Sequence, residues 1–168
     1  MRGSQPLANG KIAKKPDDAE AGWRCNFFTE CLSQNVLTWR LKYISEGREG
    51  NNAVLFGVAR KLCGNTEDAD ETYGCFINSH DGGWFHPARH GNPSLGDPPT
   101  GGENTESICA GSEVEITLDF TKRELAFAVD GKHRGTYTDL DTSQPLGLAV
   151  LLCYPGAEVK LLEVRVRV

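Results

Sequence analysis

The chain has 168 residues, 39% of them hydrophobic and 24% charged, and carries a formal net charge of −5 at pH 7. This composition supports one globular domain with its own core, and no stretch reaches the ~18 consecutive apolar residues of a membrane span. The acidic balance argues against nucleic acid as a partner, because such a surface needs cations to neutralise phosphates.

The N-terminal segment, residues 1–22, holds few apolar side chains among Gly, Pro, Lys and Asp. We expect a flexible tail there, followed by one domain over residues 23–168. Apolar and polar side chains alternate over residues 36–44, which predicts a strand with Trp39 facing inward. The nearly continuous apolar run over residues 53–59 is typical of a strand covered on both faces.

The middle of the chain is less regular. A polar loop with four acidic side chains spans residues 61–71, and residues 72–77 predict another strand. The stretch 78–104 is rich in Gly and Pro and holds three histidines. Long loops inside compact domains are usually functional or disordered, which makes this stretch a candidate for either.

The clearest pattern lies in residues 113–137. Apolar side chains alternate with polar ones over 113–120 and again over 124–129. Asp130 and Gly131 then predict a two-residue type I′ turn, because both central positions need a positive φ, which Gly adopts without steric cost. With residues 132–137 returning, we expect a three-stranded antiparallel meander.

The C-terminal part predicts two more strands. Residues 146–153 are apolar, Tyr154-Pro155-Gly156 forms a turn, and residues 157–168 return. In the last strand the apolar parity switches at Leu161-Leu162, which predicts a β-bulge there.

The order of these segments resembles the SPRY family. A Trp-containing strand (Leu37-Thr38-Trp39) precedes an FGVA strand (Phe56 to Ala59) and a Thr72-Tyr73-Gly74 strand start. The hairpin at residues 125–131 follows, and residues 146–152 lead through Tyr154-Pro155-Gly156-Ala157 to the last strand. The resemblance covers residues 29–162. It departs from the family pattern in the long histidine-bearing loop and in lacking a clear separate N-terminal PRY-like extension.

The resemblance implies an all-β fold, a jelly-roll-type antiparallel two-sheet β-sandwich, with no catalytic machinery and no cofactor. It also implies a protein-protein interaction module, an adaptor or scaffold that acts as a monomer or as a subunit of a hetero-complex. In such sandwiches the loop after the FGVA strand and the turn before the final strand lie at the partner-binding end. Here these are residues 61–71 and Tyr154-Pro155.

Aromatic side chains on loops are the best interface anchors, since they bury large area with few rotatable bonds. We therefore predict partner contacts at Lys61, Asn65, Asp68, Tyr73, Trp84, Tyr154 and Pro155. Tyr154, facing the acidic loop, is predicted to bind an extended peptide segment of basic character. The alternative for Tyr73 and Trp84 is that they fold the long loop onto the sandwich.

Other chemistries find less support. His80, His86 and His90, with Asp81, match no compact metal-ligand spacing, so we expect no metal. No cysteine lies in a nucleophile-like setting and no phosphate-binding glycine motif occurs, so we expect no enzymatic activity. The alternative function is a carbohydrate-binding lectin-like sandwich, in which Trp84 stacks on a sugar beside Asn78, Asp81 and Asn92.

The six cysteines show no CxxC pair, and no apolar leader lies near Met1. Disulfides belong to oxidising compartments, and a core of this size does not need them. We expect six thiols, several of them small buried apolar groups, as Cys153 would be. The same reasoning predicts an intracellular, cytoplasmic location.

Overall fold

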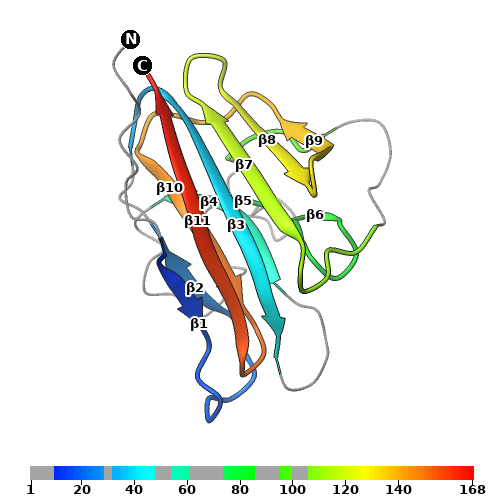
Figure 1. Ribbon diagram of the computed structural model, residues 1–168. Helices are drawn as coiled ribbons and strands as arrows, with labels where there is room; N and C mark the ends of the chain where they lie inside the picture. Colours follow the sequence, from blue (N-terminus) through cyan, green and yellow to red (C-terminus); the bar gives the residue numbers. More distant parts are fainter. Residues whose placement is uncertain (1–9, 29–31, 48–53, 61–73, 86–94, 100–105) are drawn as a thin grey trace.

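The computed structural model describes residues 10–28, 32–47, 54–60, 74–85, 95–99 and 106–168 (Figure 1). These ranges contain strands and turns but no α-helix, so no helix able to cross a membrane is found in them. The strands are β1 (Ile12–Lys14), β2 (Arg24–Phe27), β3 (Val36–Glu46), β4 (Val54–Arg60), β5 (Gly74–Asn78), β6 (Trp84–Phe85), β7 (Glu113–Asp119), β8 (Glu124–Val129), β9 (Lys132–Tyr137), β10 (Leu146–Leu152) and β11 (Ala157–Arg167).

The strands form two antiparallel sheets that pack face to face. The six-stranded sheet has the order β1-β11-β3-β7-β8-β9 and lies toward the viewer in Figure 1; we call it the front sheet. The five-stranded sheet, in the order β2-β10-β4-β5-β6, lies behind it and is the back sheet. The predicted fold class, an antiparallel two-sheet sandwich, is confirmed.

Hydrophobic periodicity explains which strands lie inside. Along β7 the apolar Val114, Ile116 and Leu118 are fully buried, whereas the residues between them are only half-buried. β10 is buried along its whole length and β4 up to its last residue, as expected for strands with both faces covered. Trp39 is 1% exposed and points into the core between the sheets, as predicted.

The back sheet carries a second, smaller apolar cluster on its outer face. Its buried members are Leu55, Ala59, Phe76, Ala149 and Leu151, and Trp23, Cys25 and Phe85 pack against them. The Phe76 ring fits there because two neighbouring positions are glycines. A Cβ at Gly57 would lie 2.7 Å from Phe76 Cδ1, and one at Gly74 would lie 2.5 Å from Phe76 Cε2.

Two local predictions are confirmed in detail. Asp130 (φ 49°) and Gly131 (φ 79°) both have positive φ, as a type I′ turn requires, and the Asp130 carboxylate also accepts the Glu113 N–H at 2.8 Å. The pairing of β11 with β3 shifts register between Leu161 and Glu163, which is the expected bulge.

The N-terminal prediction needs correction. Residues 10–22 are not a flexible tail, because Ile12–Lys14 pairs antiparallel with Glu158–Lys160 at the edge of the front sheet. Lys15, which follows this strand, is only 5% exposed. The physical reason is that the β11 edge supplies backbone partners to a segment with too few apolar side chains to fold alone. Residues 1–9 lie outside the described part of the chain.

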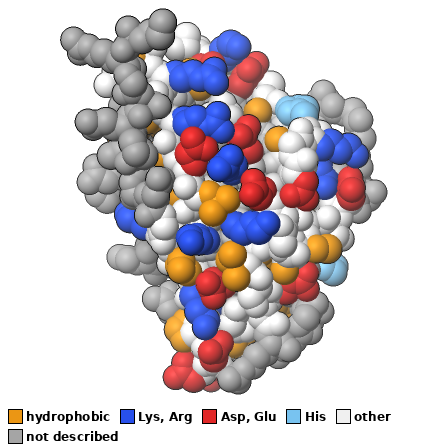
Figure 2. All heavy atoms as spheres, viewed as in Figure 1, with side chains coloured by type: hydrophobic (Ala, Val, Ile, Leu, Met, Phe, Trp, Pro, Cys, Tyr) orange, Lys and Arg blue, Asp and Glu red, His pale blue; other side chains and the backbone are white. Residues whose placement is uncertain are grey.

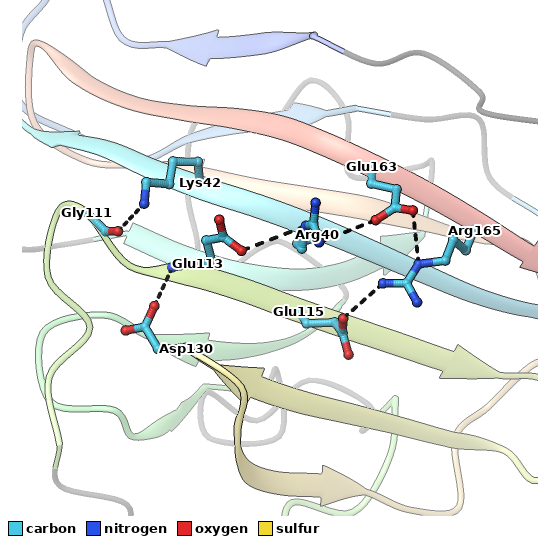
Figure 3. Close-up of polar contacts among 8 residues, drawn as sticks. All are labelled: Arg40, Lys42, Gly111, Glu113, Glu115, Asp130, Glu163 and Arg165. Atoms are coloured by element: carbon cyan, nitrogen blue, oxygen red, sulfur yellow. Dashed lines mark hydrogen bonds and ion pairs between the residues drawn. The ribbon is translucent and has the colours of Figure 1, made fainter.

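The outer face of the front sheet is charged and largely self-neutralised (Figure 3). Arg40 lies 3.8 Å from Glu113 and 3.6 Å from Glu163, and Arg165 lies 3.4 Å from Glu115 and 3.3 Å from Glu163. Figure 2 shows basic and acidic side chains mixed over this face. Exposed pairs of this kind stabilise a fold only slightly, and their mutual neutralisation leaves little net charge for a ligand.

Candidate functional site

The turn Tyr154-Pro155-Gly156 joins β10 to β11 and is clamped by the β1–β2 loop, residues 15–23. At one end of this loop the Lys15 N–H donates to the Ala157 carbonyl and the Gly156 N–H donates to the Lys15 carbonyl, both at 3.0 Å. At the other end the Gly22 N–H donates to the Cys153 carbonyl at 2.9 Å. The two ends of the loop are therefore bonded to the two ends of the turn.

The Lys15 ammonium reinforces this clamp from inside. It donates to the Cys153 carbonyl at 2.8 Å and to the Gly22 carbonyl. A hydrogen bond from a charged donor is roughly twice as strong as a neutral one, and a buried ammonium needs such acceptors. Lys15 thus holds the loop and the turn together, a role that its position in the polar stretch Lys14-Lys15 does not signal.

A third segment packs against the turn from the end of β3. Gly47 has φ 96°, and a Cβ at this position would lie 2.6 Å from the Pro155 carbonyl oxygen and 3.3 Å from Tyr154 Cβ. Both the positive φ and the close approach favour glycine here. Tyr154 and Pro155 remain half-buried, so part of each stays accessible on a fixed backbone. An aromatic ring in this position presents apolar area together with a polar hydroxyl.

The surroundings of the turn are acidic. The β1–β2 loop carries the exposed side chains of Asp17, Asp18 and Glu20. Among the described residues, Asp17 pairs with Lys14 at 3.5 Å, and Asp18 and Glu20 form no ion pair. Figure 2 shows acidic side chains at the lower end of the view, where Figure 1 places this loop. The site therefore combines a half-exposed tyrosine and proline with the exposed carboxylates of Asp18 and Glu20, while the buried Lys15 ammonium bonds carbonyl oxygens of the loop and turn.

The predicted acidic partner of Tyr154 was the loop at residues 61–71, and strand register argues against that pairing. β4 pairs with β10 from Val54 opposite Leu152 to Arg60 opposite Leu146. Tyr154 follows Leu152, whereas the loop starts after Arg60, at the other end of a strand about 20 Å long. Four predicted contact residues, Lys61, Asn65, Asp68 and Tyr73, lie outside the described residues.

Trp84 lies on β6, at the side of the sandwich where β6 meets β8 and β9. Its ring centroid is 5.7 Å from that of Phe127 and 5.5 Å from that of Tyr137. A Cβ at Gly135 would lie 2.5 Å from Trp84 Cζ2, so the ring also covers the β9 backbone. This packing supports the alternative stated for Trp84, that it folds its segment onto the sandwich.

The groups with shifted pKa values in the described residues are core groups or belong to a surface ion pair. Burial raises the pKa of the Cys75 thiol and of the Tyr43 hydroxyl well above their usual values, so both are core groups. Hydrogen bonds from Ser143, together with Arg60, lower the pKa of Asp141 to about 2, which marks a surface ion pair. The described residues contain no cluster of three or more potential metal ligands, and the predicted ligands His86 and His90 lie outside them.

No family model and no curated protein matches the sequence. Among solved structures, the SPRY domain of human HERC1 matches with a TM-score of 0.64 and 17% identity, covering 84% of this chain and 83% of that one. A human SPRY domain matches with a TM-score of 0.61 and 16% identity over 93% of each chain. This chain has the SPRY fold. The TRIM65 PSpry domain is a third match, with a TM-score of 0.51 and 15% identity over 79% of this chain and 67% of that one.

At such identities the likeness establishes architecture, and it confirms the resemblance that the sequence showed. The site has to be argued from this chain's own residues. The turn before the final strand is one of the predicted contact regions. Its described residues have an accessible aromatic group, a backbone held by hydrogen bonds, and charged neighbours.

Proposed function

We propose that the chain is a non-catalytic protein-interaction module that binds an extended, basic segment of a partner at the Tyr154 turn. The observation that carries this proposal is the clamp: Lys15 and three backbone hydrogen bonds hold Tyr154 and Pro155 beside the acidic β1–β2 loop. A preorganised aromatic anchor loses little conformational entropy on binding, and neighbouring carboxylates attract cationic side chains. The module acts inside the cell as an adaptor or as a fixed subunit.

Three of the four residues named for the lectin-like alternative make local contacts within the chain. The Trp84 ring packs against aromatic neighbours, the Asn78 side chain accepts the His80 N–H at 3.0 Å, and the Asp81 carboxylate accepts the Gly83 N–H at 2.8 Å. The Asn78 and Asp81 side chains thus bond to the backbone of the turn in which they lie. Asn92 lies outside the described residues. Nothing in the described residues favours sugar binding over protein binding.

The test of the Tyr154 site begins with affinity purification from the native source and mass spectrometry of the co-purifying proteins. Tyr154→Ala is expected to lose a partner that the unchanged chain retains, while its unfolding midpoint moves little. Tyr154→Phe keeps the ring and should retain that partner more strongly than the alanine variant. If Tyr154→Ala retains every partner, the proposed site is wrong.

The charge component needs its own pair of variants. Glu20→Lys changes the charge beside the turn, and Glu124→Lys makes the same change on β8, away from it. We expect the first to weaken binding of the identified partner and to reduce its salt dependence, and the second to leave both unchanged. Equal effects of the two variants would show that net charge, and not the β1–β2 loop, attracts the partner.

A further inference from the structure

β1 and β2, the edge strands of the two sheets, come together at one side of the sandwich (Figure 1). A cavity lies between residues of these two strands and their flanks. It has a volume of about 170 Å³ and is lined by Lys11, Ile12, Ala13, Asn26 and Phe28. Its lining therefore combines three apolar residues with a lysine and an asparagine.

The alternation of side chains along β1 explains the cavity. Ala13 is 6% exposed and points inward, so Lys11 and Lys15 share its face of the strand. Both lysines reach across to the back-sheet side, Lys11 Nζ to the Phe28 carbonyl at 3.0 Å and Lys15 Nζ to the Cys153 carbonyl at 2.8 Å. Next to Lys11, Ala13 contributes only a methyl group to the cavity lining, which leaves space open to the outside.

The backbone next to the cavity is an edge that can accept another strand. The Lys11 carbonyl accepts the Leu161 N–H and the Lys15 N–H donates to Ala157, so the odd-numbered residues face β11. In an antiparallel pair this alternation turns the N–H and C=O groups of Ile12 and Lys14 away from β11. No strand of the described chain pairs with that side of β1.

The positive charge of Lys11 indicates which side chain an added strand should carry. The Lys11 ammonium has three N–H donors and one of them serves Phe28. Among the described residues no acidic side chain lines the cavity. Lys160 and Glu158, which lie opposite Ile12 and Lys14 on β11, share the outward face of the sheet, so Lys11 is the charged group of the cavity. A carboxylate is the complementary group, although the chain as a whole carries a net charge of −5.

We propose that β1 is a docking edge for an extended segment of a partner protein, which pairs as a strand with Ile12 and Lys14 and places an acidic side chain in the cavity against Lys11. The residue opposite Ala13 shares its inward face, and its two neighbours face outward beside Ile12 and Lys14. Main-chain hydrogen bonds provide affinity in this mode, and the side-chain pocket provides specificity. The site differs from the Tyr154 turn in position and in the sign of the charge that it selects.

The first test uses two blocked pentapeptides, TVEVT and TVKVT, titrated to millimolar concentration into the full chain and followed by amide NMR. TVEVT is expected to shift the amides of Ile12, Ala13 and Lys14 and the side-chain amide of Asn26, and TVKVT is expected to bind about tenfold more weakly. No shift with TVEVT, or equal binding of the two peptides, overturns the proposal.

Variants then separate the pocket from the strand edge. Lys11→Glu should reverse the preference, so that TVKVT binds more tightly than TVEVT; an unchanged preference overturns the role of Lys11. Ile12→Pro removes an outward N–H without removing a hydrogen bond to β11, a setting in which edge strands tolerate proline. It should reduce TVEVT binding about tenfold, whereas Ile12→Ala keeps the donor and should reduce it much less.

Two controls keep the result interpretable. Amide spectra of Ile12→Pro show whether the sheet is retained, and if it is not, Lys14→Pro removes the next outward N–H in its place. Tyr154→Ala should leave TVEVT binding unchanged, so failure at one site is distinguishable from failure at the other. Loss of TVEVT binding in Tyr154→Ala would contradict a separate docking edge.

Discussion

The two open sides of this sandwich are closed in different ways. On one side, where β6 meets β8 and β9, the rings of Trp84, Phe127 and Tyr137 pack together, and the Tyr137 hydroxyl lies 2.9 Å from the Phe76 carbonyl. On the other side, where β1 meets β2, Lys11 and Lys15 bridge the sheets by hydrogen bonds to carbonyls. We call these the aromatic side and the lysine side.

The two sides differ in how much accessible surface they leave for a ligand. Aromatic rings fill space and make many weak contacts, so the aromatic side is closed by burial. In the described part of the chain, Lys11 and Lys15 make the lysine-to-carbonyl bonds across this side, and a cavity beside Ala13 and an accessible turn at Tyr154 remain. Both proposed binding surfaces therefore lie on or next to the lysine side.

The largest effect should come from the aromatic side. Trp84→Ala removes a ring that contacts Phe127 and Tyr137, and we expect a loss of about 3 kcal/mol in the free energy of unfolding, measured with urea. Ile12→Ala is the control on the lysine side, because Ile12 is 55% exposed, and it should cost less than about 0.5 kcal/mol. Equal losses would mean that burial does not distinguish the two sides.

The next effect tests the clamp. Lys15→Met keeps the aliphatic stem but leaves the carbonyls of Cys153 and Gly22 without their charged donor, so we expect about 2 kcal/mol of destabilisation. Lys14→Met is the matched control one residue earlier, where the side chain is exposed and its pair with Asp17 is worth little. Lys15→Met should also weaken binding at the Tyr154 turn, because the turn loses its support. If Lys15→Met is as stable as Lys14→Met, the Lys15 ammonium does not hold the loop and the turn together.

The β8–β9 turn gives a smaller effect on the aromatic side. Gly131 has φ 79° and no atom within 4 Å of an added Cβ, so a substitution there tests backbone conformation alone. Gly131→Val should cost about 1–2 kcal/mol, and Gly131→Asn less, because Asn tolerates the left-handed region. An unchanged thermal midpoint in the valine variant would show that the aromatic contacts hold β9 without help from its turn.

Much of the fold was predictable because local signals and tertiary packing agree in it. Alternation in residues 113–129, the Asp130-Gly131 turn and the parity switch at Leu161-Leu162 each correspond to an observed strand, hairpin or bulge. β1 was not predictable, since Ile12 and Ala13 are its only apolar residues. Its pairing depends on the β11 edge, which lies about 145 residues away in sequence.

The site was predictable only in part, for a similar reason. Tyr154 and Pro155 could be named from the sequence, because they form an aromatic turn before the last strand. The acidic loop beside them could not, because the sequence does not show which loops lie at the same end of the sandwich. Strand direction decides that, and it brings residues 15–23 to the turn while the stretch after Arg60 begins at the other end. Trp84 shows the same limit, because a tryptophan in a Gly- and Pro-rich stretch has no local signal for the rings it packs against.

The smallest expected change in stability separates the two lysines of the lysine side. Lys11 and Lys15 share one face of β1, yet Lys11 is exposed and bonds one carbonyl, whereas Lys15 is buried and bonds two. Lys11→Met should therefore change the free energy of unfolding by less than about 0.5 kcal/mol, measured with urea beside Lys15→Met. The same variant should lose most of its affinity for TVEVT, because the ammonium at the cavity wall is gone. If Lys11→Met destabilises the chain as much as Lys15→Met does, both lysines are needed to close the sandwich, and the cavity beside Lys11 and Ala13 is a packing defect instead of a docking site.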